Sequence, residues 1–274
     1  MAVNLHAKPA APAPANRAAA TKLQAFSWRE LVARLGTALP GVCALCARTG
    51  AHVLCSGCRL QYFGQTHPRC RCCGLPLSGT EPQPALCGQC LRQPPAFDAT
   101  VVAADYAAPI DQLVLELKFG ARLALAPLFA DLLGQAVLAV LAAQPDGALS
   151  ATLPDYLIPV PLGALRLQQR GFNQALEIAR PLATALGLAI APRLLVRTRE
   201  TAAQARLPPR ERRLNLRGAF TLTPASLKQV RGCHVGVVDD VMTTGQTLHE
   251  IAATLKRFGA ARVTNLVFAR TLPK

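Results

Sequence analysis

Eight of the ten cysteines have a spacing that could bind metal. They form four Cys-x-x-Cys pairs, Cys43/Cys46, Cys55/Cys58, Cys70/Cys73 and Cys87/Cys90. This spacing lets one turn aim two thiolates at a single ion, and two such turns complete a tetrahedral zinc site. Four pairs therefore predict two structural zinc ions. The alternative, a disulfide scaffold, needs an oxidising compartment that nothing in the sequence indicates, so we expect a cytoplasmic protein.

The four pairs can be combined in two ways. A sequential scheme joins the first two pairs into one site and the last two into another, whereas an interleaved scheme alternates them. We favour the sequential scheme because its loops are short. Cys72 could compete for the second metal, but the spacing favours Cys73. The cysteine segment either supplies folding energy alone or also contacts nucleic acid or a partner, for which Arg48, Arg59, Arg69, Arg71 and Lys22 are nearby.

A second stretch, "VVDDVMTTGQT" at residues 237–247, combines carboxylates with a Thr/Gly-rich turn. Gly245 permits backbone angles that let the amides from Thr243 to Thr247 point inward, and the following helix N-terminus favours an anion such as phosphate. Asp239 and Asp240 can accept hydrogen bonds from hydroxyls or hold a divalent metal. Together these groups suit a sugar phosphate. The alternative is that they only cap a turn and start a helix.

The elements around this stretch predict how it is positioned. An apolar run at 233–238, helical spacing over 248–258 and a second apolar run at 263–269 indicate a parallel strand–helix–strand unit. Upstream, expected strands at 99–106, 155–162 and 192–199 alternate with expected helices at 110–120 and 172–188. This order predicts an α/β domain with a mostly parallel sheet flanked by helices and a ligand at the carboxyl ends of the strands.

One apolar segment, residues 123–143, is long enough to span a membrane. Pro127, Asp131 and Gln135 interrupt it, so we expect a core helix and no membrane span.

Several motifs resemble a known family. Residues 237–247 are similar to the phosphoribosyl-pyrophosphate (PRPP) signature of type I phosphoribosyltransferases, in which two acids precede a Thr-Thr-Gly-x-Thr loop. "LKFG" at 117–120, "IPVPL" at 158–162, "RGFNQA" at 170–175, "NLRGAF" at 215–220 and the cysteine pairs extend the resemblance to the ComF family. Members of that family are phosphoribosyltransferase-like, carry an N-terminal zinc ribbon, and are linked to DNA uptake in natural transformation.

The resemblance implies roles for particular residues. In the superfamily the acids hold the ribose hydroxyls, the loop holds the 5′-phosphate, and magnesium accompanies PRPP. The implied PRPP-binding residues are Asp239, Asp240, Val241, Met242, Thr243, Thr244, Gly245, Gln246 and Thr247, with Arg166 and Arg170 where the superfamily places its pyrophosphate loop. The alternative for the two arginines is a solvated basic helix start. No catalytic base stands out from the sequence.

Composition and charge complete the expectations. The chain has 274 residues and a formal net charge of +15, which suggests an anionic substrate or a polyanionic partner. The Ala/Pro-rich start predicts a disordered tail with a short helix over residues 1–38. A double zinc ribbon is then expected over 39–92 and a phosphoribosyltransferase-like domain over 97–274.

Two classes of function are compatible with these features. The first is transfer of a ribosyl 5-phosphate group from PRPP with release of pyrophosphate. The second is a non-catalytic, PRPP-sensing competence factor that binds single-stranded DNA, with proteins of the competence machinery as candidate partners. An arginine-rich segment, residues 193–217, serves either class, since it could close over PRPP or grip DNA phosphates.

Overall fold

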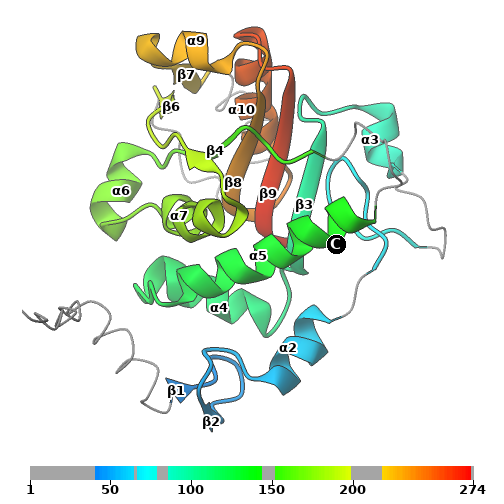
Figure 1. Cartoon of the computed structure of the whole chain (residues 1–274), viewed down its shortest axis with the longest axis vertical. Coiled ribbons are helices and arrows are strands. Elements are labelled where there is room, and N and C mark those ends of the chain that lie inside the picture. Colours follow the sequence, from blue (N-terminus) through cyan, green and yellow to red (C-terminus); the bar gives the residue numbers. More distant parts are fainter. Residues whose placement is uncertain (1–40, 65–66, 79–85, 144–151, 199–217, 273–274) are drawn as a thin grey trace, which may run out of the picture. The chain divides into compact units, whose positions relative to one another are not determined.

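The computed structural model describes residues 41–64, 67–78, 86–143, 152–198 and 218–272 (Figure 1). The expected N-terminal tail and most of the arginine-rich segment lie outside these residues. The described residues belong to one compact unit that begins at Gly41.

A five-stranded parallel sheet forms the centre of this unit. It contains β3 (Ala99–Asp105), β4 (Tyr156–Pro159), β5 (Ala189–Ile190), β8 (His234–Met242) and β9 (Arg262–Arg270), in the order β3-β9-β8-β4-β5. Every pair of neighbouring strands is parallel. β8 and β9 are almost entirely buried, as expected for apolar, β-branched strands covered on both faces. The predicted parallel α/β architecture is confirmed.

Helices cover both faces of the sheet (Figure 1). On one face, α4 (Ile110–Phe119), α5 (Leu125–Ala142) and α7 (Gln174–Leu186) enclose a core with Val238, Leu266 and Phe268. There the Phe129 and Phe268 rings stack with their centroids 3.6 Å apart. On the other face, α10 (Gln246–Arg257) packs over Val237 and Val267. The chain therefore has two separate hydrophobic cores.

The smaller elements surround this frame. The strand expected at 192–199 forms as β6 (Leu195–Arg197), but it pairs antiparallel with β7 (Phe220–Leu222) and does not join the main sheet. Its inward residues pack in the α10-side core instead. The remaining elements are β1 (Gly41–Val42), β2 (Thr49–Gly50), α2 (Ser56–Phe63), α3 (Gly88–Arg92), α6 (Ala164–Arg170), η2 (Pro224–Ser226) and α9 (Leu227–Val230).

Helix α5 is the apolar segment that could be mistaken for a membrane span. By length and composition it alone among the described helices passes that test, and 50% of its residues are buried inside the protein. The buried residues, including Leu125, Phe129 and Leu133, belong to the core shared with α7 and the sheet. This packing is that of the expected core helix.

Candidate functional site

Asp239 and Asp240, hereafter the acid pair, lie near the carboxyl end of the central strand β8. Asp240 is only 3% exposed, and its Oδ2 atom lies 2.8 Å from Nζ of Lys118 at the end of α4. Its Oδ1 accepts a hydrogen bond from the Val241 amide, 2.9 Å away. Burial and the adjacent Asp240 charge raise the pKa of Asp239, while Lys118 opposes this shift. The site therefore concentrates negative charge that a cation or hydroxyl donors would stabilise.

Lys118 is a site residue to which sequence analysis assigned no role, although it lies in the "LKFG" motif. The sequence pattern could have indicated a role for Lys118, because this lysine directly follows the buried residues Leu113, Val114 and Leu117 on the core side of α4. The next residue, Phe119, is 74% exposed. The guanidinium carbon of Arg170 lies over its ring, 5.4 Å from the centroid. The end of α4 thus supplies a charge to Asp240 and an exposed aromatic ring next to Arg170.

Residues 243–247, hereafter the phosphate loop, connect β8 to α10. Thr243 and Thr244 are exposed, whereas Met242 beneath them is 2% exposed. Gly245 has a φ of +77°, in the left-handed region, and an added Cβ would clash with Met242 Cε. A glycine N-cap offers no side-chain oxygen to the first-turn amides of α10. Free amides, exposed hydroxyls and a helix N-terminus are groups suited to an anion.

Arg170 is brought toward the acid pair, as its electrostatics indicate. Burial lowers the pKa of Arg170, the Asp240 charge raises it, and Arg166 lowers it. Nη1 of Arg170 donates to Oε1 of Gln174, which orients the guanidinium. Asn173 has a structural role, since its Oδ1 accepts from the Ala175 amide at 3.0 Å and its Nδ2 donates to the Val160 carbonyl at 3.0 Å. The "RGFNQA" motif therefore holds Arg170 at the end of α6, just before α7 begins.

The other acids that lie near candidate loops are placed differently. Asp155 Oδ2 accepts a hydrogen bond from the His234 amide, 2.7 Å away, at the amino end of β8. Glu177 forms an ion pair with Arg180 at 3.3 Å. Of the arginine-rich segment, Arg193 and Arg197 are described, and Arg197 lies over the Phe220 ring, 5.7 Å from its centroid. None of these contacts involves the acid pair.

The eight paired cysteines form two clusters in the sequential scheme. The first cluster is Cys43, Cys46, Cys55 and Cys58, and the second cluster is Cys70, Cys73, Cys87 and Cys90; within each, all sulfur atoms lie within 4.8 Å of one another. The Sγ atoms of Cys46 and Cys55 are 3.7 Å apart, and those of Cys73 and Cys87 are 3.6 Å apart. A tetrahedral zinc ion with Zn–S bonds of about 2.3 Å needs sulfur separations of roughly 3.8 Å. Both clusters fit zinc.

Backbone amides favour the thiolate form of one cysteine in each cluster, Cys43 and Cys70. The Cys55 amide donates to Cys43 Sγ at 3.4 Å, and the Cys87 amide donates to Cys70 Sγ at 3.3 Å. Burial raises the pKa of Cys43, but amide donors, including the Cys55 amide, lower this pKa overall to about 6. A hydrogen bond from Cys73, with several amides, lowers the pKa of Cys70 to about 4. Cys72 lies outside the second cluster and donates to the Phe97 carbonyl at 3.8 Å, as expected from the spacing.

Two arginines of the cysteine segment, which the sequence offers for nucleic-acid contact, instead make ion pairs within the chain. Arg59 Nη2 lies 2.7 Å from Asp131 on α5, and Arg69 Nη1 lies 2.8 Å from Asp105 at the end of β3. These contacts fasten both clusters to the α/β unit.

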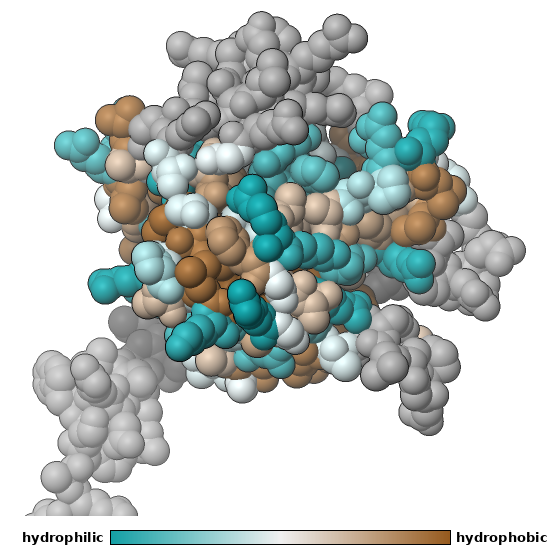
Figure 2. All heavy atoms as spheres, turned by 90° about the horizontal axis from the view of Figure 1, so that it is seen from above, coloured by the Kyte–Doolittle hydropathy of each residue, from teal (hydrophilic) through white to brown (hydrophobic). Residues whose placement is uncertain are grey.

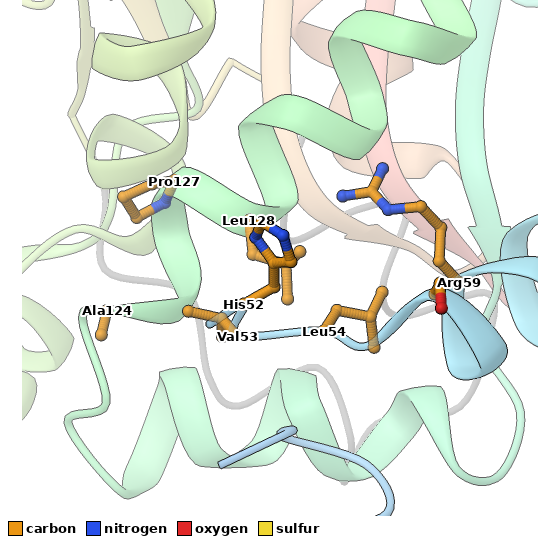
Figure 3. Close-up of a pocket in the computed structure, with 8 residues that line it drawn as sticks. His52, Val53, Leu54, Arg59, Ala124, Pro127 and Leu128 are labelled. Carbon is orange, nitrogen blue, oxygen red and sulfur yellow. The ribbon is translucent and has the colours of Figure 1, made fainter. Parts of the chain in front are cut away.

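Two surface hollows lie elsewhere. One lies between residues 52–59, near the first cluster, and the start of α5, and is lined by His52, Val53, Leu54, Ser56, Arg59, Ala124, Pro127 and Leu128 (Figure 3). The other is lined by Leu227, Arg231, Arg257, Phe258 and Gly259. Figure 2 looks onto the end that carries α9, where hydrophilic side chains interrupt the hydrophobic ones. Neither hollow contains the acid pair or the phosphate loop, so the candidate site is defined by its chemistry.

Comparison with known domain families defines the class of protein. Residues 35–91 match the double zinc ribbon domain, and residues 167–272 match the phosphoribosyl transferase domain. The second match includes the acid pair, the phosphate loop and Arg170. The chain is thus a double zinc ribbon joined to a phosphoribosyltransferase-type domain.

Whole-chain relatives identify the family. The chain is 40% identical over 238 residues to DNA utilization protein YhgH of Salmonella typhimurium, covering 85% of this chain and 99% of the relative. It is 35% identical over 210 residues to competence protein F of Haemophilus influenzae, covering 77% and 87% respectively. The chain belongs to the ComF family.

Solved structures resemble the chain more distantly. Glutamine PRPP amidotransferase from B. subtilis, complexed with ADP and GMP, is 20% identical, with a TM-score of 0.32, covering 51% of this chain and 25% of that one. A protein of Thermus thermophilus is 17% identical, with a TM-score of 0.31, covering 54% and 84%.

Proposed function

We propose that the protein binds PRPP and transfers its ribosyl 5-phosphate group to an acceptor with release of pyrophosphate. The observation that carries this proposal is the acid pair, of which Asp240 is buried, placed directly before a glycine-capped phosphate loop at the carboxyl end of the central strand. The family's phosphoribosyltransferase-type domain supports it. In this transfer, the bond between C1 of the ribose and the pyrophosphate oxygen breaks. A new bond joins C1 to the acceptor, which loses a proton.

The residues of the site divide this work. The amides and hydroxyls of the phosphate loop would hold the 5′-phosphate, and the acid pair would accept hydrogen bonds from the ribose hydroxyls. Arg170 and Arg166 would hold the pyrophosphate oxygens, because a planar guanidinium is suited to bidentate contact with phosphate. Lys118 would hold the Asp240 side chain in place through their ion pair. Magnesium would supply positive charge to the leaving pyrophosphate, and Asp239, whose carboxylate is crowded by Asp240, is the protein group suited to it.

The proposal extends to the remaining parts of the chain. We assign one zinc ion to each cysteine cluster, a zinc ribbon to residues 39–92 and the transferase domain to 97–274. A cytoplasmic location would keep the eight metal-binding cysteines reduced.

Calorimetry with PRPP and magnesium tests the binding. The Asp239→Asn/Asp240→Asn variant keeps the side-chain shape but removes both charges, so PRPP affinity should fall on the order of a hundredfold or more through loss of charge-assisted hydrogen bonds. Asp131→Asn, which removes an exposed acid on α5, is the control and should bind as the wild type does. Equal affinity in all three proteins would rule out the assignment of the acid pair. Pyrophosphate release with bases and single-stranded DNA as acceptors tests the transfer.

A second function, binding of single-stranded DNA, is favoured by Phe119. This ring is 74% exposed and lies beside Lys118 and Arg170, so it offers a base-stacking surface among cations. The names of the relatives, DNA utilization protein and competence protein, agree with it. A titration of labelled single-stranded DNA at two salt concentrations, with and without PRPP, should show binding that weakens steeply with salt. Competition by PRPP would place the DNA at the transferase site, and absence of binding at low salt would exclude the function.

A further inference from the structure

Arg270, the last residue of β9, joins three separate segments of the chain. The residue is 5% exposed. Its Nε donates to the carbonyl of Cys73 at 3.0 Å, and its Nη1 donates to the carbonyl of Met242 at 3.0 Å. Nη1 also donates to the carbonyl of Thr243, the first residue of the phosphate loop. One buried guanidinium therefore connects a ligand of the second cluster with the backbone that begins the phosphate loop.

A second contact path runs between the same two places. Cys72, beside the metal ligand Cys73, donates its thiol to the Phe97 carbonyl at 3.8 Å. The Phe97 ring in turn reaches the loop, since a Cβ on Gly245 would lie 3.8 Å from Phe97 Cζ. Met242, Phe97 and the cysteines Cys70, Cys73 and Cys90 share the hydrophobic core on the α10 side. The loop is thus connected to the second cluster by the hydrogen bonds of Arg270 and by packing in this core.

The first cluster has different surroundings. Cys43 and Cys58 belong to the core on the opposite face of the sheet, with Leu54 and the residues of α5. Arg59 of that segment also contacts α5 through an ion pair with Asp131 at 2.7 Å and a hydrogen bond to Gln135 at 3.1 Å. Among the described residues, no hydrogen bond joins the first cluster to residues 242–246. The two metal sites therefore differ in their relation to the phosphate loop.

The charge of Arg270 strengthens the link. A buried guanidinium loses its hydration and needs compensation, which carbonyl oxygens give only in part. A zinc ion with four thiolates carries formally two net negative charges, and the second cluster is adjacent to Arg270 through Cys73. A filled second site would therefore stabilise the guanidinium in the orientation that holds the Met242 and Thr243 carbonyls.

We propose that Arg270 is a positioning residue that couples metal occupancy of the second cluster to the conformation of the phosphate loop. The first cluster has no such effect. With a filled second site the loop is held ready for a phosphate group; without the metal, Cys73 and then Arg270 are released and the loop loosens. The identity of the ligand, PRPP, rests on the proposed function. The coupling itself concerns only the loop and the metal.

The experiment compares three variants of the full-length protein. Cys87→Ser removes a ligand of the second cluster, Cys46→Ser removes one of the first, and Arg270→Lys keeps the charge but loses the planar fork. Metal analysis should give one zinc ion for each cysteine variant and two for Arg270→Lys. Hydrogen–deuterium exchange then measures how fast the loop amides exchange, and peptides from α7 serve as the internal reference for general destabilisation.

The coupling predicts a specific pattern. Exchange over residues 242–248 should become at least about tenfold faster in Cys87→Ser and Arg270→Lys, as loss of one or two hydrogen bonds from a charged donor implies. Exchange in α7 should stay unchanged, and Cys46→Ser should leave the loop at the wild-type rate. PRPP affinity should fall in the first two variants only.

Two results would overturn the coupling. The first is that the loop amides of Arg270→Lys exchange at the wild-type rate. The second is that the loop amides exchange at the same rate in Cys87→Ser and Cys46→Ser. If wild-type protein fails to bind PRPP, the proposed function fails, and the exchange data still decide the coupling.

Discussion

At the scale of single residues, Asp240 is held in an ion pair with Lys118. A carboxylate that is 3% exposed at the end of a parallel strand would be costly without a partner, and Lys118 supplies that partner at 2.8 Å. The ion pair involves Oδ2 of Asp240, whereas Asp239 is only partly buried. Asp239 and Asp240 thus have different surroundings although they are adjacent and identical in type.

Gly245 is the residue at which the loop geometry can be tested without changing any charge. Its φ of +77° is unfavourable for alanine by about 1 to 2 kcal/mol, and the added methyl would displace the buried Met242 side chain under the loop. Gly245→Ala should therefore lower stability by about that amount and also weaken PRPP binding. Gly187, with a φ of +67° and open space around its Cβ position, is the matched control. Denaturation and calorimetry should show similar destabilisation of both variants but weaker binding only for Gly245→Ala; equal binding would mean that the loop tolerates the methyl.

At the scale of elements, the local pattern predicts the unit β8–α10–β9 within a few residues. Alternation of apolar strands with an amphipathic helix is a short-range property, and Gly245 and Gly259 indicate both helix ends. The same pattern does not say which sheet a short strand joins, so β6 was expected beside the parallel strands and lies in an antiparallel pair with β7. Pairing partners depend on the whole fold, which local sequence does not contain.

The contacts of the candidate site that sequence analysis missed are all long-range. The acid pair and the loop form one continuous segment and were visible as a motif. Lys118 reaches Asp240 from α4, and Arg270 reaches Cys73 across the chain, so each partner becomes apparent only when the sheet is assembled. The cysteine clusters were predictable because a metal site fixes ligand spacing in the sequence itself.

The end of helix α4 carries the prediction for DNA. Phe119→Ala removes the exposed ring but leaves Lys118 and Arg170, so single-stranded DNA should bind more weakly by about 1 to 3 kcal/mol, the contribution of one stacked base. Leu165→Ala, which truncates an apolar side chain on α6 that is 58% exposed, serves as the control. Fluorescence anisotropy at low salt measures both. A Phe119→Ala variant with wild-type affinity would restrict the DNA contact to phosphates.

At the scale of the whole molecule, the two cysteine clusters stabilise different parts of the fold. Cys43 and Cys58 complete the core beneath α5, and Cys70, Cys73 and Cys90 complete the core beneath α10. Each metal ion would therefore add folding free energy to one face of the sheet. The strongly basic chain, with a formal net charge of +15, also gains negative charge where the thiolates bind zinc. Metal binding, core formation and charge compensation are thus linked on both faces.

The clusters should release their metal at different rates. In the first cluster Cys46 is exposed and Cys55 is partly buried, whereas in the second cluster Cys70, Cys73 and Cys90 are buried and Cys87 is partly buried. A chelator must reach the thiolates, so zinc release followed with a colorimetric chelator should show two phases, the faster one from the first cluster. Cys46→Ser should remove the fast phase and Cys87→Ser the slow one. A single phase, or loss of the slow phase in Cys46→Ser, would show that burial of the ligands does not control access to the metal.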